Sequence, residues 1–244
     1  VSMGYKIAIC EQTEDPAKAV GLVRREVIRV VTPGTVVENT LLSEGKNNYL
    51  ASVASVDDVV GVAFCDISTG EVSATMFMGP SRFDRLVSEV ATYQPSEIIA
   101  GPLLSELGAL ENYVKRVGIM TTCGETKRFS KKECEQLVRA RFRDYMPDDS
   151  NIAATTAAGA LLSYIAETQK LELSYISKLD FYAESQYLVM DAATRRNLEL
   201  CETMRAKEKR GSRARPHEDA DGREVHAPLG RAAAREFLRA EPQA

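Results

Sequence analysis

Residues 59–77 contain the pattern that most restricts the fold of this chain. Residues 59–67 read VVGVAFCDI, an apolar run with one charged residue that is short for a helix and rich in β-branched side chains. Such a run indicates a buried strand. Residues 68–70 supply turn chemistry, and residues 71–77 alternate apolar with polar side chains, as a strand with one wetter face does. The pattern predicts a hairpin on which later helices can pack, and by itself it says nothing of function.

The segments around this hairpin alternate between strand and helix patterns. Predicted in chain order are a strand at Tyr49–Val53, a helix capped by Ser81 and ended by Pro95, and a strand at 97–100. A short helix at 103–110 and a strand at 114–121 follow. A capping box of Ser130 and Glu133 then opens a helix that carries Phe142 and Tyr145 on its apolar face, and a long helix follows Ser150. The long helix is predicted to reach Gln169 or Lys170, with its apolar residues on one side. Three antiparallel strands, helix and strand alternation and closing helices predict an α/β sandwich of the ribonuclease H-like kind, a mixed sheet with helices on its faces.

The composition is that of an ordinary globular protein. Of 244 residues, 44% are hydrophobic and 27% are charged, and neither a membrane span of ~18 apolar residues nor a signal peptide is present. A cytoplasmic protein is therefore expected. The five cysteines show no CxxC spacing, which argues against a disulfide framework or a zinc site and predicts that most are core thiols. A net charge of −4 gives no global reason to expect nucleic acid, but it does not exclude a local basic face that binds it.

Two short strands are predicted near the start of the chain, at Tyr5–Cys10 and Val27–Val31. The second is stopped by the sequence TPGT at 32–35. Two strands with a short connection cannot bury a core alone. A segment before Val1 is therefore expected to complete their domain.

A resemblance to a known family rests on three motifs. Residues 4–16, GYKIAICEQTEDP, and residues 25–35, REVIRVVTPGT, together resemble the end of the N-terminal domain of the MutS family of DNA mismatch repair proteins. Residues 190–200, MDAATRRNLEL, where Asp191 is predicted to cap a helix, resemble the start of the core and lever domain of the same family.

The resemblance implies a fold class and five parts of the chain. The fold class is α/β, with a ribonuclease H-like connector domain flanked by an incomplete α/β domain and the first helix of an all-α core domain. The parts are the C-terminal end of the mismatch-recognition domain at 1–35, a linker at 36–48, the connector domain at 49–170, a linker with the start of the core and lever domain at 171–212, and a tail at 213–244.

The tail does not continue the family pattern. It contains eight alanines, six arginines and few large apolar residues. Suitable codons from Arg213 onward also encode, one nucleotide out of frame, a sequence that begins VLDRTKTPMGGK and resembles the family's continuation. A frameshift at or just after Ser212 is therefore expected, with an unusual natural tail as the alternative. Such a composition is expected to be disordered in either case.

The function follows from the resemblance. MutS homodimers bind duplex DNA, insert an aromatic side chain of an F-x-E motif at a mismatch, and use a P-loop ATPase with ATP and magnesium to switch state and recruit MutL. The motif is expected before Val1 and the ATPase after the frameshift, so no catalytic, cofactor-binding or metal residue is assigned. Partner docking by the connector is the activity that remains, and whether the chain is an enzyme stays open.

A second hypothesis is a stand-alone nuclease with two magnesium or manganese ions, since a ribonuclease H-like sheet can carry one. Asp66, at a central strand end, is the plausible first ligand, and the helices offer Asp84, Glu89 and Glu167, although their spacing does not place them on one patch. The alternative for Asp66 is a turn residue that hydrogen-bonds its own loop.

Other chemistries find less support in the sequence. Both histidines, His217 and His226, lie in the tail, which leaves no histidine base in the predicted domains. The chain contains neither a P-loop nor a GxGxxG sequence. Arg195 and Arg196 are candidate phosphate contacts, and a solvated or ion-paired helix face is their alternative.

Overall fold

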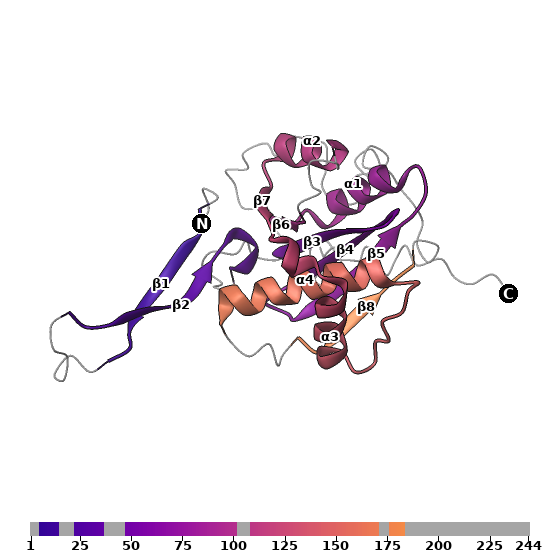
Figure 1. Ribbon diagram of the computed structural model, residues 1–244. Helices are drawn as coiled ribbons and strands as arrows, with labels where there is room; N and C mark the ends of the chain where they lie inside the picture. Colours follow the sequence, from indigo (N-terminus) through magenta and orange to yellow (C-terminus); the bar gives the residue numbers. More distant parts are fainter. Residues whose placement is uncertain (1–4, 15–21, 37–46, 102–107, 171–175, 184–244) are drawn as a thin grey trace, which may run out of the picture. The chain divides into compact units, whose positions relative to one another are not determined.

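The structure, a computed structural model, describes residues 5–14, 22–36, 47–101, 108–170 and 176–183 (Figure 1). The chain divides into two compact units, Val1–Glu184 and Ser185–Ala244. All of the described residues lie in the first unit.

A six-stranded mixed sheet forms the centre of this unit, with the strand order β7-β6-β3-β4-β5-β8. Strands β3 (Tyr49–Val56), β4 (Val59–Asp66) and β5 (Glu71–Phe77) are antiparallel neighbours, which confirms the predicted hairpin and the strand before it. On one side β6 (Glu97–Ala100) and β7 (Met120–Cys123) continue the sheet parallel to β3. On the other side β8 (Lys178–Phe181) runs parallel to β5.

Helices cover both faces of the sheet, as Figure 1 shows. Helices α1 (Arg82–Tyr93) and α2 (Gly108–Val117) pack on one face, and α3 (Lys131–Arg141) and α4 (Ile152–Gln169) pack on the other. Successive residues of a strand point to opposite faces. Phe64 therefore lies in the core under α1, whereas its neighbour Cys65 lies in the core under α4. The predicted α/β class, a mixed sheet with helices on its faces, is confirmed.

Helix α4 is buried on nearly all sides, because the sheet packs on one side of it and α3 on the other. Fourteen of its eighteen residues are buried, so the predicted one-sided stripe describes only the part that faces the sheet. The close approach of α4 to β4 and to α3 depends on two glycines. A Cβ atom on Gly61 of β4 would lie 2.1 Å from the carbonyl oxygen of Ala153, and one on Gly159 would lie 2.4 Å from Cβ of Cys134 in α3.

The predicted strand at 114–121 is wrong in its first half. Leu110 and Val114 are both buried on α2, four residues apart, which is helical spacing. The helix ends before Gly118, whose φ is 79°, and the strand begins only at Met120. Of the short helix predicted at 103–110, only the last three residues fall within the described part of the chain, where they begin α2.

The predicted caps are wrong in their hydrogen bonding. Ser81 and Ser130 precede α1 and α3 as predicted, but neither side chain makes a capping hydrogen bond. The end of α1 is predicted correctly, since Gln94 adopts the left-handed conformation there, with φ of 49°. The helix α3 also ends before Phe142 and Tyr145, which the prediction had placed within it.

Strands β1 (Ile7–Gln12) and β2 (Arg25–Val31) form an antiparallel pair, as predicted. The register shifts between Ile9 and Cys10, which is a β-bulge. Ile7, Ile9 and Ile28 are exposed, as expected of two strands that cannot bury a core alone. β2 leads into the short 3-10 helix η1 (Pro33–Thr35).

The segment at 171–186 contains a strand that the sequence analysis did not predict, β8. Most of the predicted linker at 36–48, the helix predicted from Asp191, the arginine pair 195–196 and the tail at 213–244 lie outside the described residues. No described helix is long and apolar enough to cross a membrane.

The cysteines divide between core and surface. Cys65 and Cys134 are buried, whereas Cys10 and Cys123 are exposed, so the predicted burial holds for two of the four that the structure describes. Burial raises the pKa of the Cys134 thiol to about 12, and burial likewise raises the pKa of Cys65. The fifth, Cys201, lies outside the described residues.

The contact between Gly61 and α4 can be tested by adding one methyl group. We expect Gly61→Ala to lower the free energy of unfolding by about 3 kcal/mol, because the new Cβ would overlap the backbone of Ala153. Gly108→Ala is the matched control, since a Cβ there has no atom within 4 Å. Urea unfolding of both variants measures the difference, and equal stabilities would contradict the close approach.

Candidate functional site

Asp66 ends β4 and is 1% exposed. Its Oδ1 accepts the backbone N–H and the hydroxyl of Ser68, at 2.9 and 2.6 Å, and its Oδ2 accepts the backbone N–H of Asn48 at 3.3 Å. The carboxylate thus holds the turn into β5 and the start of β3. This is the role of a turn residue, which the sequence left open as the alternative to a metal ligand.

The other carboxylates of the nuclease hypothesis do not gather around Asp66. Glu89 accepts a tyrosine hydroxyl at 2.7 Å, Glu167 pairs with Arg128, and Asp84 lies in the first turn of α1. Within the described ranges, no group of three or more His, Cys, Asp or Glu residues could hold a metal ion. The arrangement that two-metal cleavage requires is therefore not assembled in this part of the chain.

Asn48 connects the Asp66 turn to the segment after β2. Its Nδ2 donates to the carbonyl oxygens of Pro33 and Val36, at 3.0 and 3.3 Å. Its Oδ1 accepts the hydroxyl of Ser96 at 2.6 Å. One side chain therefore holds η1 beside the adjacent ends of β3 and β6.

Glu97, the first residue of β6, is completely buried. Its Oε2 accepts the Thr32 hydroxyl and, at 3.2 Å, the Gly34 N–H. Its Oε1 accepts the hydroxyls of Thr122 and Tyr164, both at 2.7 Å. Burying a carboxylate is costly unless hydrogen bonds replace its hydration, and here each oxygen accepts two. The residues that meet at this place form what we call the η1 junction: Thr32–Thr35, Asn48, Glu97, Thr122 and Tyr164.

Tyr164 places the η1 junction against α4. Burial, and then the charge and hydrogen bond of Glu97, raise the pKa of the Tyr164 phenol above its ordinary value of about 10. Cations flank the ring, with Lys6 Nζ 5.4 Å and the Arg128 guanidinium 5.3 Å from its centre. The phenol stays protonated, which is the form that donates to Glu97.

The C-terminal end of α4 holds β2 at a second place. Gln169 Nε2 donates to the carbonyl oxygen of Val30 at 3.3 Å, and Lys170 Nζ donates to that of Val27 at 2.5 Å. Lys170 adopts φ of 49°, the left-handed conformation that ends many helices. The segment from β2 to η1 is therefore bonded to α4 as well as to the sheet.

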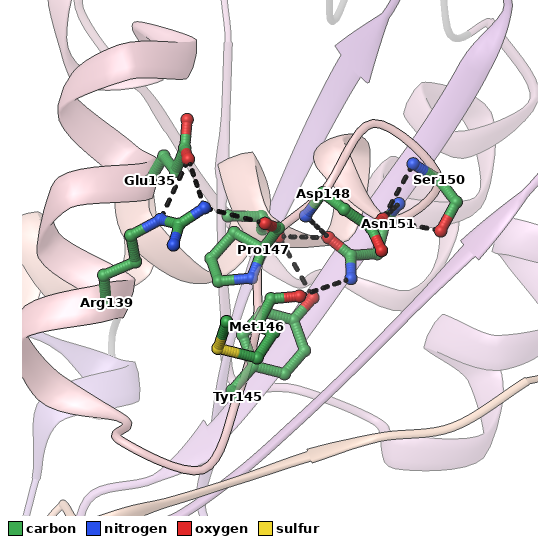
Figure 2. A network of polar contacts seen from close by, with 9 residues as sticks. Glu135, Arg139, Tyr145, Met146, Pro147, Asp148, Ser150 and Asn151 are labelled. Carbon is green, nitrogen blue, oxygen red and sulfur yellow. Dashed lines mark hydrogen bonds and ion pairs between the residues drawn. The ribbon is translucent and has the colours of Figure 1, made fainter.

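A separate polar network orders the loop between α3 and α4 (Figure 2). Arg139 donates to Glu135 and to the carbonyl oxygen of Pro147, in each case at 2.9 Å. Asp148 Oδ1 accepts the Ser150 hydroxyl at 2.6 Å, and this bond is the main cause that lowers the pKa of the Asp148 carboxyl. Asn151 Nδ2 donates to the carbonyl oxygen of Met146 at 3.1 Å. These bonds fix the start of α4, and they carry no chemistry of their own.

The η1 junction positions segments and offers no open ligand position. The four donors to Glu97 are neutral, and both of its oxygens are occupied. No site residue is assigned from the sequence, which misses Asn48 and Glu97. Asn48 falls in a predicted linker, and Glu97 is predicted only as the start of a strand. The available signal is a lone carboxylate beside two isoleucines in a short buried strand.

Comparison with known proteins assigns the two segments that meet at the η1 junction to the same family. A family model described as MutS domain II matches residues 48–177, and one described as MutS domain I matches residues 1–40.

Several relatives carry the name DNA mismatch repair protein MutS. That of Acetivibrio thermocellus is 43% identical over 214 residues, which cover 87% of this chain and 25% of the relative. That of Ruminiclostridium cellulolyticum is 44% identical over 214 residues, which cover 87% of this chain and 24% of the relative. That of Methanococcoides burtonii is 37% identical over 209 residues, which cover 84% of this chain and 24% of the relative. The chain spans about a quarter of the length of the curated relatives it matches.

The turn role of Asp66 predicts a loss of stability without any effect of metal. We expect Asp66→Ala to lower the free energy of unfolding by about 1–3 kcal/mol, because the backbone N–H groups of Ser68 and Asn48 lose their charged acceptor. Asp58→Ala, which removes a fully exposed carboxylate, is the control and should leave the stability nearly unchanged. Thermal unfolding with and without millimolar magnesium checks both points, and a magnesium shift that depends on Asp66 would restore the metal hypothesis.

The raised pKa of Tyr164 predicts a dependence of stability on alkaline pH. The unfolded phenol ionises near pH 10 whereas the folded one does not, so the stability that Tyr164 contributes is complete below pH 10 and declines above it. Tyr164→Phe should therefore cost about 1 kcal/mol at pH 8 and less as the pH rises past 10. Urea unfolding across this range tests it, with Tyr5→Phe on the exposed Tyr5 as control, and a constant difference would be the contrary result.

Proposed function

The chain belongs to the MutS family of DNA mismatch repair proteins, and we propose that it supplies the connector that attaches a mismatch-recognition domain to the remainder of such a protein. The observation that carries the proposal is the match of two successive family models, to 1–40 and 48–177, on either side of one hydrogen-bonded junction. In this role the chain holds neighbouring domains in position and passes movements of one domain to the next. A buried, hydrogen-bonded junction can do this without a catalytic group.

We propose a ribonuclease H-like topology for the connector. Three antiparallel strands stand in the order β5-β4-β3, and two parallel strands, β6 and β7, continue the sheet beyond β3. Helices on both faces support the same topology. Strand β8 is an addition to it at the other edge.

The five-part division of the chain is also a proposal. It assigns 1–35 to the end of the mismatch-recognition domain, 36–48 to a linker, 49–170 to the connector, 171–212 to a linker and the start of the core, and 213–244 to a frameshifted tail. The relatives leave 13% or more of the chain unmatched, which is the size of that tail and fits a tail outside the family pattern, whether frameshifted or natural. The nucleotide sequence across the Ser212 codon decides between a frameshift and a natural tail.

The partners follow from the family rather than from the described residues. We propose that the whole protein binds mismatched double-stranded DNA, forms a homodimer, uses ATP with magnesium and recruits MutL in the cytoplasm. The relatives' name, DNA mismatch repair protein MutS, supports the process as a whole. Of these activities, the one that we assign to this chain is the docking of MutL on the connector.

The nuclease alternative is not favoured. Asp66 accepts hydrogen bonds from its own turn and from Asn48, and Glu89 and Glu167 are engaged with Tyr182 and Arg128. The connector proposal needs no such site.

A chimeric protein tests the proposed function in the cell. Residues 1–212 of this chain would replace the matching quarter of Acetivibrio thermocellus MutS, produced in a bacterial strain that lacks its own MutS. We expect the chimera to lower the spontaneous mutation frequency about as far as intact A. thermocellus MutS does, because 43% identity over this stretch preserves the connector fold.

Two controls make the result decisive. Intact A. thermocellus MutS in the same strain sets the range of the assay, and the chimera carrying Gly61→Ala tests whether the connector must be correctly packed. A well-folded chimera that leaves the mutation frequency at the level of the strain without any MutS would contradict the proposed function.

A further inference from the structure

The two oxygens of Glu97 serve two different parts of the molecule. Oε2 accepts donors of the η1 segment, Thr32 and Gly34. Oε1 accepts donors of the sheet domain, Thr122 on the edge strand β7 and Tyr164 on α4. A single rigid carboxylate group is therefore shared between a segment that enters the sheet domain and the elements that receive it.

The packing around η1 leaves little freedom for this segment to shift. A Cβ atom on Gly34 would lie 2.7 Å from Cδ1 of Leu50 and 2.9 Å from Cβ of Glu97, so the backbone at Gly34 lies directly on the sheet. Thr32 and Thr35 are completely buried, and the Thr32 N–H donates to the Thr35 hydroxyl at 2.8 Å. Any displacement of η1 breaks buried hydrogen bonds.

The charge of Glu97 is solvated by neutral donors, three hydroxyls and one backbone N–H. An apolar residue of similar volume could pack at such a position with no desolvation cost. What an apolar residue cannot do is accept four directed hydrogen bonds from three different segments. Geometry is thus the specific contribution of this carboxylate, since a directed bond weakens steeply when its angle changes.

We propose that Glu97 is a mechanical coupling between strand β2 with η1 and the elements β7 and α4. A shift of β2 moves Thr32 and Gly34, and the shared carboxylate transmits that shift to Thr122 and Tyr164. The bonds from Gln169 and Lys170 to β2 attach the far end of α4 to the same strand. The biological sense of the coupling, from a mismatch-recognition domain to its connector, rests on the proposed function.

Hydrogen exchange of the full 244-residue chain, followed by mass spectrometry, tests the coupling without DNA or MutL. Thr32→Val removes a donor from Oε2, and Thr122→Val removes a donor from Oε1 on the other side of the carboxylate. Both variants are expected to accelerate exchange of the amides at 25–36 by about tenfold. The effect of Thr122→Val on 25–36 is the decisive result, because the bond that it removes joins β7 to Glu97.

Two references distinguish coupling from a general loss of stability. Thr92→Val makes the same chemical change on α1, where the hydroxyl only donates to the carbonyl oxygen of Ser88 in its own helix, and it should leave 25–36 unchanged. Amides of β4 should keep their protection in every variant. Acceleration of β7 alone by Thr122→Val, no acceleration of 25–36 by Thr32→Val, or equal acceleration of β4 would each overturn the coupling. None of these results depends on whether the chimera functions in repair.

Discussion

The packing of α4 is the constraint on which the rest of the structure depends. A helix that is buried against a sheet on one side and against α3 on the other needs small side chains at both contacts. Gly61 and Gly159 meet this need, and alanines occupy much of the helix between its larger apolar residues. Two of its threonines are satisfied within the helix itself, since Thr156 donates to the carbonyl oxygen of Ile152 at 2.7 Å and Thr168 to that of Tyr164 at 2.8 Å. The third, Thr155, donates to Oδ1 of Asn151 at 3.0 Å, just before the helix begins.

The position of α4 in turn decides where the buried polar groups can be satisfied. Tyr164 reaches Glu97 only because α4 crosses the sheet over β4 and β3, and β3 is the neighbour of β6. Gln169 reaches β2 only because the helix continues to that point. Glu97 would be an expensive residue at the start of a buried strand without these donors. The same arrangement explains why the molecule uses this carboxylate for position and not for chemistry, because no oxygen of Glu97 is left open to a ligand.

Local patterns predicted the elements whose stability is local. The hairpin of β4 and β5 combines an apolar run, a turn sequence and an alternating strand, and all three signals agree. Prediction failed where two structures share one pattern. The residues around Val114 contain β-branched side chains typical of a strand, but burial of Leu110 and Val114 on one face favours the helix. Ser130 shows the same limit, since its sequence fits a capping box and its side chain makes no capping bond.

By itself the sequence determined the α/β class, the central hairpin, the long helix and, through three motifs, the likeness to MutS, because each depends on residues close together in the chain. Only the tertiary structure decided the η1 junction. Thr32, Asn48, Glu97 and Tyr164 are separated by long stretches of chain, and each taken alone is an ordinary turn, linker, strand or helix residue. Their role arises from directed hydrogen bonds in a buried place, and such bonds exist only after the sheet and α4 have brought the residues together.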